Sequence, residues 1–90
     1  MKPTYKILKD AREIVKTRWQ KGAYGANGGP RCAAGAIAEV SGYDLSISEN
    51  CLAARLILSG SDEPYLSIFN DNSTHEEVIS AFTKAMRKAR

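Results

Sequence analysis

Apolar residues recur at helical spacing near the start of the chain. Ile7, Leu8, Ala11, Ile14 and Val15 lie three or four positions apart, which places them on one face of a helix. We expect this helix to open at Pro3 and Thr4, with Thr4 as its cap. Trp19 follows Val15 by four residues and should extend the apolar face, and Gly22 should end the helix.

The last third of the chain shows the same spacing in its clearest form. Six apolar residues stand in near-perfect helical register: Val78, Ile79, Phe82, Ala85, Met86 and Ala89. Two overlapping capping boxes precede them, Ser73-x-x-Glu76 and Thr74-x-x-Glu77. Acidic residues at the start of the helix and basic residues at its end suit the helix dipole, so this element is the most clearly marked in the sequence.

Shorter helical segments are expected in between. A helix rich in small residues should run from Pro30 to about Ser41 and end at Gly42. Another should begin near Ile47, opened by the capping box Ser46–Glu49, and end at Gly60. Asp62 and Pro64 could start a short helix that runs through Phe69, with a brief strand over residues 65–69 as the alternative. Residues 70–73 then read as a turn.

These elements predict an all-α fold: a compact single-domain bundle, spanning residues 1–90, of four principal helices plus one short helix. The apolar and charged fractions, 43% and 26%, are typical of a globular domain. The expected core consists of Leu8, Val15, Trp19, Ile37, Leu52, Leu56, Phe69, Val78, Phe82 and Met86.

The composition of the chain excludes some classes of protein. Charged residues fill the N-terminal segment, so we expect no signal peptide, and no apolar run is long enough to span a bilayer. Cys32, Cys51 and one His do not make a ligand set for structural zinc, so we expect no metal or cofactor. The expected setting is the cytoplasm, with both thiols reduced and buried. The net charge of +3 permits an acidic partner without requiring one.

The sequence offers little to support catalysis. His75 is the only imidazole, and it lies in the first turn of the last predicted helix, where the dipole disfavours its charged form. A Ser-His-Asp arrangement with Asp71 has nothing specific behind it. We therefore expect a protein that is not an enzyme.

The loop between Gly22 and Gly29 is the strongest candidate for a binding site. It lacks the Gly-Lys-Ser/Thr ending of a phosphate-binding P-loop, and no apolar strand precedes it. Backbone N–H groups of Gly28, Gly29, Arg31 and Cys32, at the start of the predicted helix, could still bind an anion. In that case Arg31→Ala should leave stability unchanged and abolish binding. The alternative is a plain connection in which Arg31 pairs with Asp71 or Glu39.

Other polar residues could join this site. Arg12 lies at the edge of an apolar helix face, where its stem could simply cover the core. Arg55 interrupts another apolar face and needs either a carboxylate partner, such as Glu39 or Asp71, or a bound anion. The candidate ligand-binding residues are Arg12, Trp19, Lys21, Gly28, Gly29, Arg31, Cys32, Arg55, Asn70 and Asp71.

A family resemblance covers most of the chain. It rests on Ala11-Arg12, on Trp19 followed by Gly22-Ala23, on Cys32-Ala33-Ala34-Gly35-Ala36, and on Asn70-Asp71 leading to Thr74-x-x-x-Val78. In this order the motifs resemble an uncharacterised family of small proteins from bacteria and their phages, although the segment between Trp19 and Cys32 is shorter here. The resemblance implies a compact single-domain fold and a phage or mobile-element setting, and no catalytic residues.

Three functions remain open from the sequence. The first is a non-catalytic binding protein that holds a small anionic, nucleotide-like ligand at the glycine-rich loop. The second is a protein–protein inhibitor of a host defence protein, acting as an oligomer through exposed helix faces. The third is a nucleic-acid-binding regulator, because residues 30–58 resemble a helix-turn-helix in outline. The helix that would read DNA is too apolar for that role, however.

Overall fold

Six α-helices and no strand make up residues 3–90, which are the residues described by the computed structural model. In chain order the helices are α1 (Pro3–Arg18), α2 (Ala33–Ser41), α3 (Leu45–Ser48), α4 (Leu52–Leu58), α5 (Leu66–Asp71) and α6 (His75–Ala89). β-type pairing in this range is limited to isolated bridges from Arg31 to Trp19 and Gly25. The all-α prediction is confirmed, with four helices of seven or more residues and two shorter ones.

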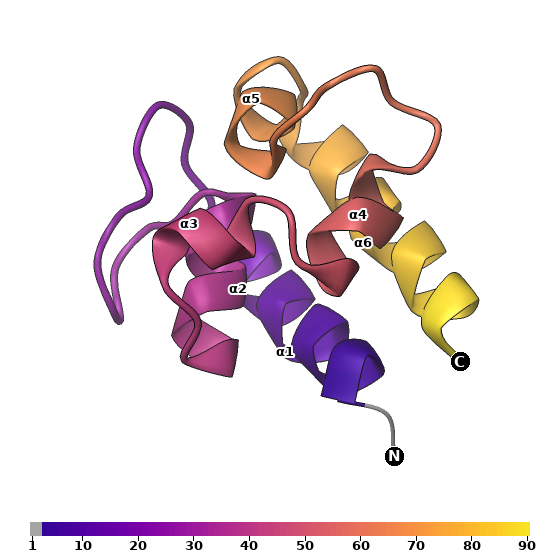
Figure 1. The fold of residues 1–90 in the computed structure, drawn as a ribbon. Helices are drawn as coiled ribbons and strands as arrows, with labels where there is room; N and C mark the ends of the chain where they lie inside the picture. The colour runs from indigo at the N-terminus through magenta and orange to yellow at the C-terminus, as the bar shows by residue number, and fades with distance from the viewer. Residues whose placement is uncertain (1–2) are drawn as a thin grey trace.

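The long helices α1 and α6 pack against each other (Figure 1). α2 packs against α1, and α4 packs against both long helices. α5 lies across the top of this group in the view of Figure 1, and the loop after α1 forms its left side. The largest apolar side chains that are fully buried are Leu8, Val15, Ile37, Leu66, Val78 and Phe82. Most of the predicted core is therefore correct, and α4 also contributes buried residues, among them Ala54 and Ile57.

α6 forms as its sequence predicts. Thr74 caps it: its hydroxyl accepts from Glu77 N at 3.1 Å, and the Glu77 carboxylate accepts from Thr74 N at 2.8 Å. Of the two possible capping boxes, the second is used. Val78 and Phe82 are completely buried by this register.

α1 ends earlier than predicted. Its last residue is Arg18, so Trp19 lies outside the helix and Gly22 does not terminate it. The carbonyl of Arg18 accepts from Arg31 N at 2.7 Å, and Gln20 N donates to Arg31 O at 3.1 Å. This pairing with a distant segment replaces the next helical turn. Thr4 lies inside the helix, which starts at Pro3, and does not cap it from outside.

α2 starts three residues later than predicted. Pro30 is outside the helix, Arg31 is extended, and Cys32 is the N-cap, with Sγ accepting from Gly35 N at 3.4 Å. The close approach of Tyr24 explains why glycine stands at position 35, since a Cβ there would lie 2.2 Å from Tyr24 O. The predicted end at Gly42 is correct.

The helix predicted from Ile47 is divided into α3 and α4. The N-caps are Asp44 and Cys51, and Ser46 lies within α3, so the predicted capping box does not form. Glu49 turns inward instead: its carboxylate accepts from the Tyr24 hydroxyl and from Ser67 N. The break between α3 and α4 exposes Leu52, which is 62% accessible. The prediction that Leu52 belongs to the core is therefore wrong.

α5 confirms a short helix in preference to the alternative strand. It begins after the N-cap Tyr65, later than Asp62 or Pro64 would suggest. Asn70 and Asp71 belong to the last helical turn of α5, whereas the sequence predicted that both lie in a non-helical turn after the helix.

The described residues also bear on membranes and on disulfides. None of the helices in residues 3–90 has the length and apolar character needed to cross a bilayer. Cys32 and Cys51 are free thiols, as expected, but only Cys32 is fully buried.

Candidate functional site

The glycine-rich loop is organised by the carboxylate of Glu39, in the last turn of α2. Glu39 accepts two hydrogen bonds from the guanidinium of Arg18, at 3.2 and 2.7 Å, and one from Arg31 Nη1 at 3.3 Å. Gly28 N in the loop donates to the same carboxylate at 3.3 Å. The hydrogen bonds from Arg18 hold the pKa of Glu39 well below its usual value, at about 2. We call Arg18, Gly28, Arg31 and Glu39 the Glu39 cluster.

Three of the four backbone donors that the sequence assigned to a bound anion, those of Gly28, Gly29 and Arg31, have partners inside the protein. Gly28 N is bound to Glu39, and Gly29 N donates to Ala26 O at 2.9 Å. Arg31 is only 5% exposed, and besides Glu39 its guanidinium binds Tyr24 O and Asn27 Oδ1 at 3.0 and 2.8 Å. The anion beside Arg31 is therefore the protein's own carboxylate. Of the two partners considered from the sequence, Asp71 and Glu39, the structure has Glu39.

Asn70 connects the two ends of the loop to α5. Its side chain is fully buried, and Oδ1 accepts from Trp19 Nε1 and from Ala33 N, the latter at 3.0 Å. Nδ2 donates to Gln20 O at 3.0 Å. The neighbouring Asp71 accepts from Gly22 N at 2.8 Å. These two candidate residues hold the loop in place.

Trp19 lies between two cationic or titratable side chains. Its ring stacks on the imidazole of His75, with centroids 4.8 Å apart and planes 3° from parallel. The ammonium of Lys21 lies 5.9 Å from the indole centroid. His75 Nε2 is hydrogen-bonded to Val15 O, so the imidazole ties α6 to α1.

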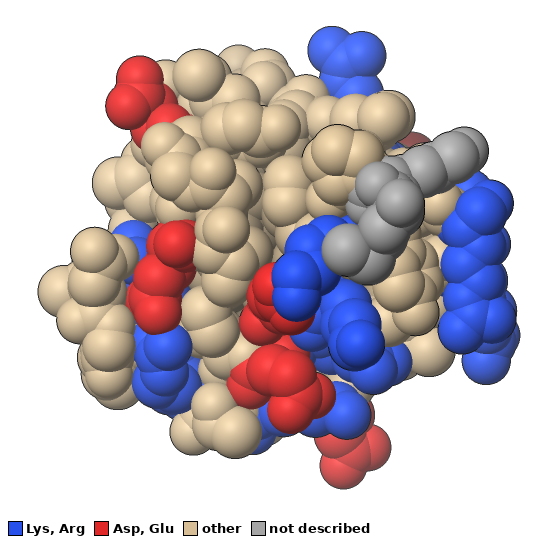
Figure 2. Space-filling view, turned by 90° about the horizontal axis from the view of Figure 1, so that it is seen from below, with Lys and Arg blue, Asp and Glu red and all other residues tan. Residues whose placement is uncertain are grey.

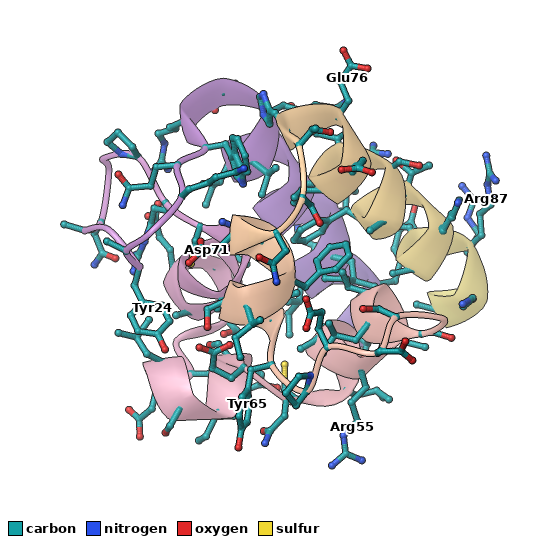
Figure 3. The ribbon with its side chains drawn as sticks, turned by 90° about the horizontal axis from the view of Figure 1, so that it is seen from above. Tyr24, Arg55, Tyr65, Asp71, Glu76 and Arg87 are labelled. Atoms are coloured by element: carbon teal, nitrogen blue, oxygen red, sulfur yellow. The ribbon has the colours of Figure 1, made fainter. Side chains whose placement is uncertain are left out.

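A cavity of about 280 Å³ lies beside the loop. It is lined by Gly22, Ala23, Tyr24, Cys32, Ser67 and Asp71. Tyr24 and Asp71 lie on the same side of the molecule (Figure 3). Burial raises the pKa of the Cys32 thiol. A neutral thiol is a poor nucleophile, which does not favour covalent chemistry at this position.

Arg12 and Arg55 lie apart from the loop. Arg12 Nη1 donates to Thr83 Oγ1 at 3.1 Å and so joins α1 to α6. Arg55 is exposed, donates through Nε to Asn50 O at 3.0 Å and points away from the body of the protein (Figure 3). The prediction of a carboxylate partner for Arg55 is wrong. The chain breaks between α3 and α4, and this break places Arg55 at the surface. The ten candidate residues thus do not form one site.

A larger cavity, of about 310 Å³, lies between α4, α5 and α6, and we call it the lysine pocket. One stripe of α6 forms a wall of it: Glu77, Ser80, Ala81, Lys84 and Lys88. Leu56 and Ile57 of α4, Phe69 and Ser73 of α5, and residues 59–61 complete the lining. Residues 59–61 make a tight turn, with Ser61 N donating to Leu58 O at 2.8 Å and Gly60 at φ +88°.

The sequence did not single out the lysine pocket. Lys84 and Lys88 read as ordinary basic residues at a helix C-terminus, and Phe69 read as core. The available signal was their spacing: positions 77, 81, 84 and 88 follow the helical repeat and share one face. That signal alone does not show whether the face meets another helix or a cavity.

The two lysines bring uncompensated positive charge to the pocket. The ion pairs within residues 3–90 involve Lys6, Lys16, Arg18 and Arg31, so neither Lys84 nor Lys88 has a carboxylate partner there. Seen from below, Lys and Arg side chains mix with Asp and Glu over the centre of the molecule, and stand without them at the right-hand edge (Figure 2). Glu77 is the one acidic residue in the lining, and one of its oxygens caps α6.

The fold defines a small all-α domain with a cavity between α4, α5 and α6. The chain belongs to the family described as "Family of unknown function (DUF6197)", whose model matches residues 1–88. This agrees with the expectation of an uncharacterised family. No curated protein and no solved structure matches the chain.

Proposed function

We propose that the protein is a non-catalytic binding protein for a small anionic, nucleotide-like ligand, and that the ligand occupies the lysine pocket. The observation that carries this proposal is the pair Lys84 and Lys88, which line a cavity and have no carboxylate partner within residues 3–90. The ligand class is the one expected from the sequence. The location is different, because Glu39 occupies the loop position where an anion was expected.

Size and lining support a small ligand. A volume of about 310 Å³ is at the lower end of the range for small-molecule sites. Such sites combine apolar walls with a few polar groups, and here Phe69 and Leu56 supply apolar surface while the two lysines and the serines supply donors. An ammonium group on a flexible stem suits a phosphate, which accepts hydrogen bonds from several directions.

Ligand-dependent thermal stability tests the proposal. The probes are inorganic phosphate and the mono-, di- and triphosphates of the common nucleosides, each added to the full chain. A ligand present at 100 times its Kd adds about 2.7 kcal/mol to the free energy of unfolding. For a domain of this size that corresponds to a rise in Tm of roughly 10–20 °C.

A matched pair of variants locates the binding. Lys84→Ala combined with Lys88→Ala should abolish the rise in Tm, while Arg87→Ala should retain it. The Arg87→Ala substitution removes the same kind of charge from the same helix. The Arg87 side chain points away from the body of the protein (Figure 3). Equal loss in both variants would indicate general attraction to a basic helix end and contradict a site in the pocket.

A protein partner is the second candidate, favoured by one observation. Ile47, Leu52 and Tyr65 are large apolar residues that are 47%, 62% and 48% exposed. Leu66 N donates to Glu49 O at 3.2 Å, so the start of α5 runs beside the segment between α3 and α4. Exposed apolar surface of this kind is typical of an interface.

Light scattering at increasing protein concentration tests this candidate for a second copy of the chain. Leu52→Asp should shift any oligomer to monomer. A monomer at every concentration would leave a different protein, such as a host defence protein, as the partner to seek. Resemblance to small bacterial and phage proteins supports that setting.

Nucleic acid is a third and weaker proposal. It draws support from the basic residues near the end of α6, including Arg87 and Arg90. α4, which would read bases in a helix-turn-helix, has only seven residues, however. Binding to any duplex that weakens steeply with salt would favour this function over the first.

A further inference from the structure

The lysine pocket has opposite charges at its two ends along α6. Glu77 lies in the first turn of the helix, and Lys84 and Lys88 lie two and three turns later on the same face. At 1.5 Å per residue, Glu77 and Lys84 are about 10 Å apart along the helix axis. A ligand that fills the cavity therefore meets a carboxylate at one end and ammonium groups at the other.

An aromatic residue, Phe69, also lines the lysine pocket. Phe69 and Ser73 are one turn apart in and after α5, joined by a hydrogen bond from Ser73 Oγ to Phe69 O at 2.7 Å. Ser73 immediately precedes Thr74, which caps α6 together with Glu77. Phe69 lines the same cavity as Glu77, so it supplies an aromatic, apolar surface to the pocket.

Glu77 retains hydrogen-bonding capacity for a ligand. Its Oε1 accepts from Thr74 N, and its side chain has a second carboxylate oxygen that also accepts hydrogen bonds. A carboxylate cannot donate, so the complementary group on a ligand is an N–H donor. Phosphate is excluded from this end by charge repulsion and is directed to the lysines.

We propose that the lysine pocket selects nucleoside monophosphates whose base carries an exocyclic amino group. This inference rests on the proposed function and names the ligand class for the same site. The amino group donates to Glu77, the base packs on Phe69, and the phosphate pairs with Lys84 and Lys88. At the exocyclic position, an oxo group in place of the amino group presents an acceptor to the carboxylate, so the hydrogen bond made there is lost and the only remaining donor is the adjacent ring N–H.

Two matched ligand pairs test this selectivity: AMP against IMP, and CMP against UMP. The members of each pair differ by an amino or an oxo group at one ring position, and the adjacent ring nitrogen is an acceptor in AMP and CMP but an N–H donor in IMP and UMP. By calorimetric titration of the full chain, we expect the amino-bearing member of at least one pair to bind about 10- to 100-fold more tightly. Equal affinity within both pairs, or preference for IMP and UMP, overturns the inference while leaving the binding of anionic ligands in place.

Glu77→Gln is the diagnostic variant. Glutamine also serves in a capping box, so α6 should keep its start and the free protein its Tm. The amide can donate to an oxo group, so the preference should disappear or reverse. Glu76→Gln is the control, because Glu76 is the preceding residue and points away from the protein (Figure 3).

A preference that survives Glu77→Gln unchanged overturns the role of Glu77 and thus the inference. Failure of all four nucleotides to bind the wild-type protein is a different result. It overturns the proposed function itself, and the selectivity with it.

Discussion

Arg18 and Glu39 form a two-pronged ion pair between the end of α1 and the last turn of α2. Nη1 and Nη2 of Arg18 lie 3.2 and 2.7 Å from the two oxygens of Glu39. The same guanidinium donates to Gly29 O at 2.7 Å. One pair of side chains therefore sets both the distance between two helices and the path of the loop that joins them.

Acid should weaken the fold through Glu39. Its pKa is lowered from 4.5 to about 2, chiefly by hydrogen bonds from Arg18. Because the pKa is lower in the folded state, the stabilisation is fully present above the unfolded-state value and is lost as pH falls from about 4.5 towards 2. Thermal melts should show a difference in Tm between wild type and Glu39→Gln that is constant near neutral pH and shrinks over this interval.

Glu13→Gln is the control for that measurement. Glu13 lies 3.7 Å from Lys16 in an exposed pair, so its removal should change Tm little at any pH. A wild-type advantage over Glu39→Gln that persists undiminished to pH 2 would contradict the assignment.

Arg31→Ala should destabilise the protein, contrary to what an anion site at the loop would give. The side chain is buried, and its removal leaves Glu39, Tyr24 O and Asn27 with lost partners. Breaking a buried ion pair by removing one partner costs about 3–5 kcal/mol. Chemical denaturation should show this loss, and Lys21→Ala in the same loop should show almost none. An unchanged midpoint for Arg31→Ala would restore the anion-site interpretation.

Gly35→Ala tests how closely α2 approaches the loop. The added methyl carbon would lie 2.2 Å from Tyr24 O and 2.9 Å from Arg31 Nε, so backbone must move. Overpacking of this kind costs about 1–3 kcal/mol, measured as a shift in the denaturation midpoint. Helix propensity alone would make Gly35→Ala more stable than wild type by about 1 kcal/mol, so a loss of stability reports the clash with the loop. Stability equal to wild type in Gly35→Ala would mean that the loop does not pack on α2.

Phe82→Ala and Leu52→Ala compare a buried and an exposed residue that the sequence placed in the same core. Phe82 is fully buried, and its truncation should cost about 3–5 kcal/mol because a large cavity remains. Leu52 is mostly exposed, so its truncation should stay within about 0.5 kcal/mol. Similar losses at the two positions would contradict the break between α3 and α4.

Local signals predicted the helices whose determinants are local. α6 has its capping box, its charges and its apolar register within fifteen residues, and it forms accordingly. The end of α1 and the start of α2 were misplaced because Arg18 and Arg31 pair across thirteen positions, which periodicity does not register. The capping box predicted from Ser46 and Glu49 does not form for the same reason. Glu49 instead binds Tyr24 and Ser67, which are distant in sequence.

The binding sites show the same division. The sequence named Arg31 and Asn70 as ligand-binding residues of the glycine-rich loop, and in the structure both hold the loop in place. The sequence could not tell an internal carboxylate from a bound anion. The lysine pocket is lined by residues from α4, α5, the turn over residues 59–61 and α6, which are distant from one another in sequence. No local pattern in α6 reports that space, so Lys84 and Lys88 looked like ordinary surface charges.

Asn70 also sets an order of events during synthesis of the chain. The groups it binds belong to Trp19, Gln20 and Ala33, between 37 and 51 positions earlier. Long-range contacts of this kind form late, because the intervening chain must first be closed into a loop. A nascent chain that ends before residue 70 therefore contains the whole glycine-rich segment but lacks its central anchor. The segment's contacts with Arg18 and Glu39 need no residue beyond position 39, whereas the bonds from Asn70 require the last third of the polypeptide to fold back onto the first.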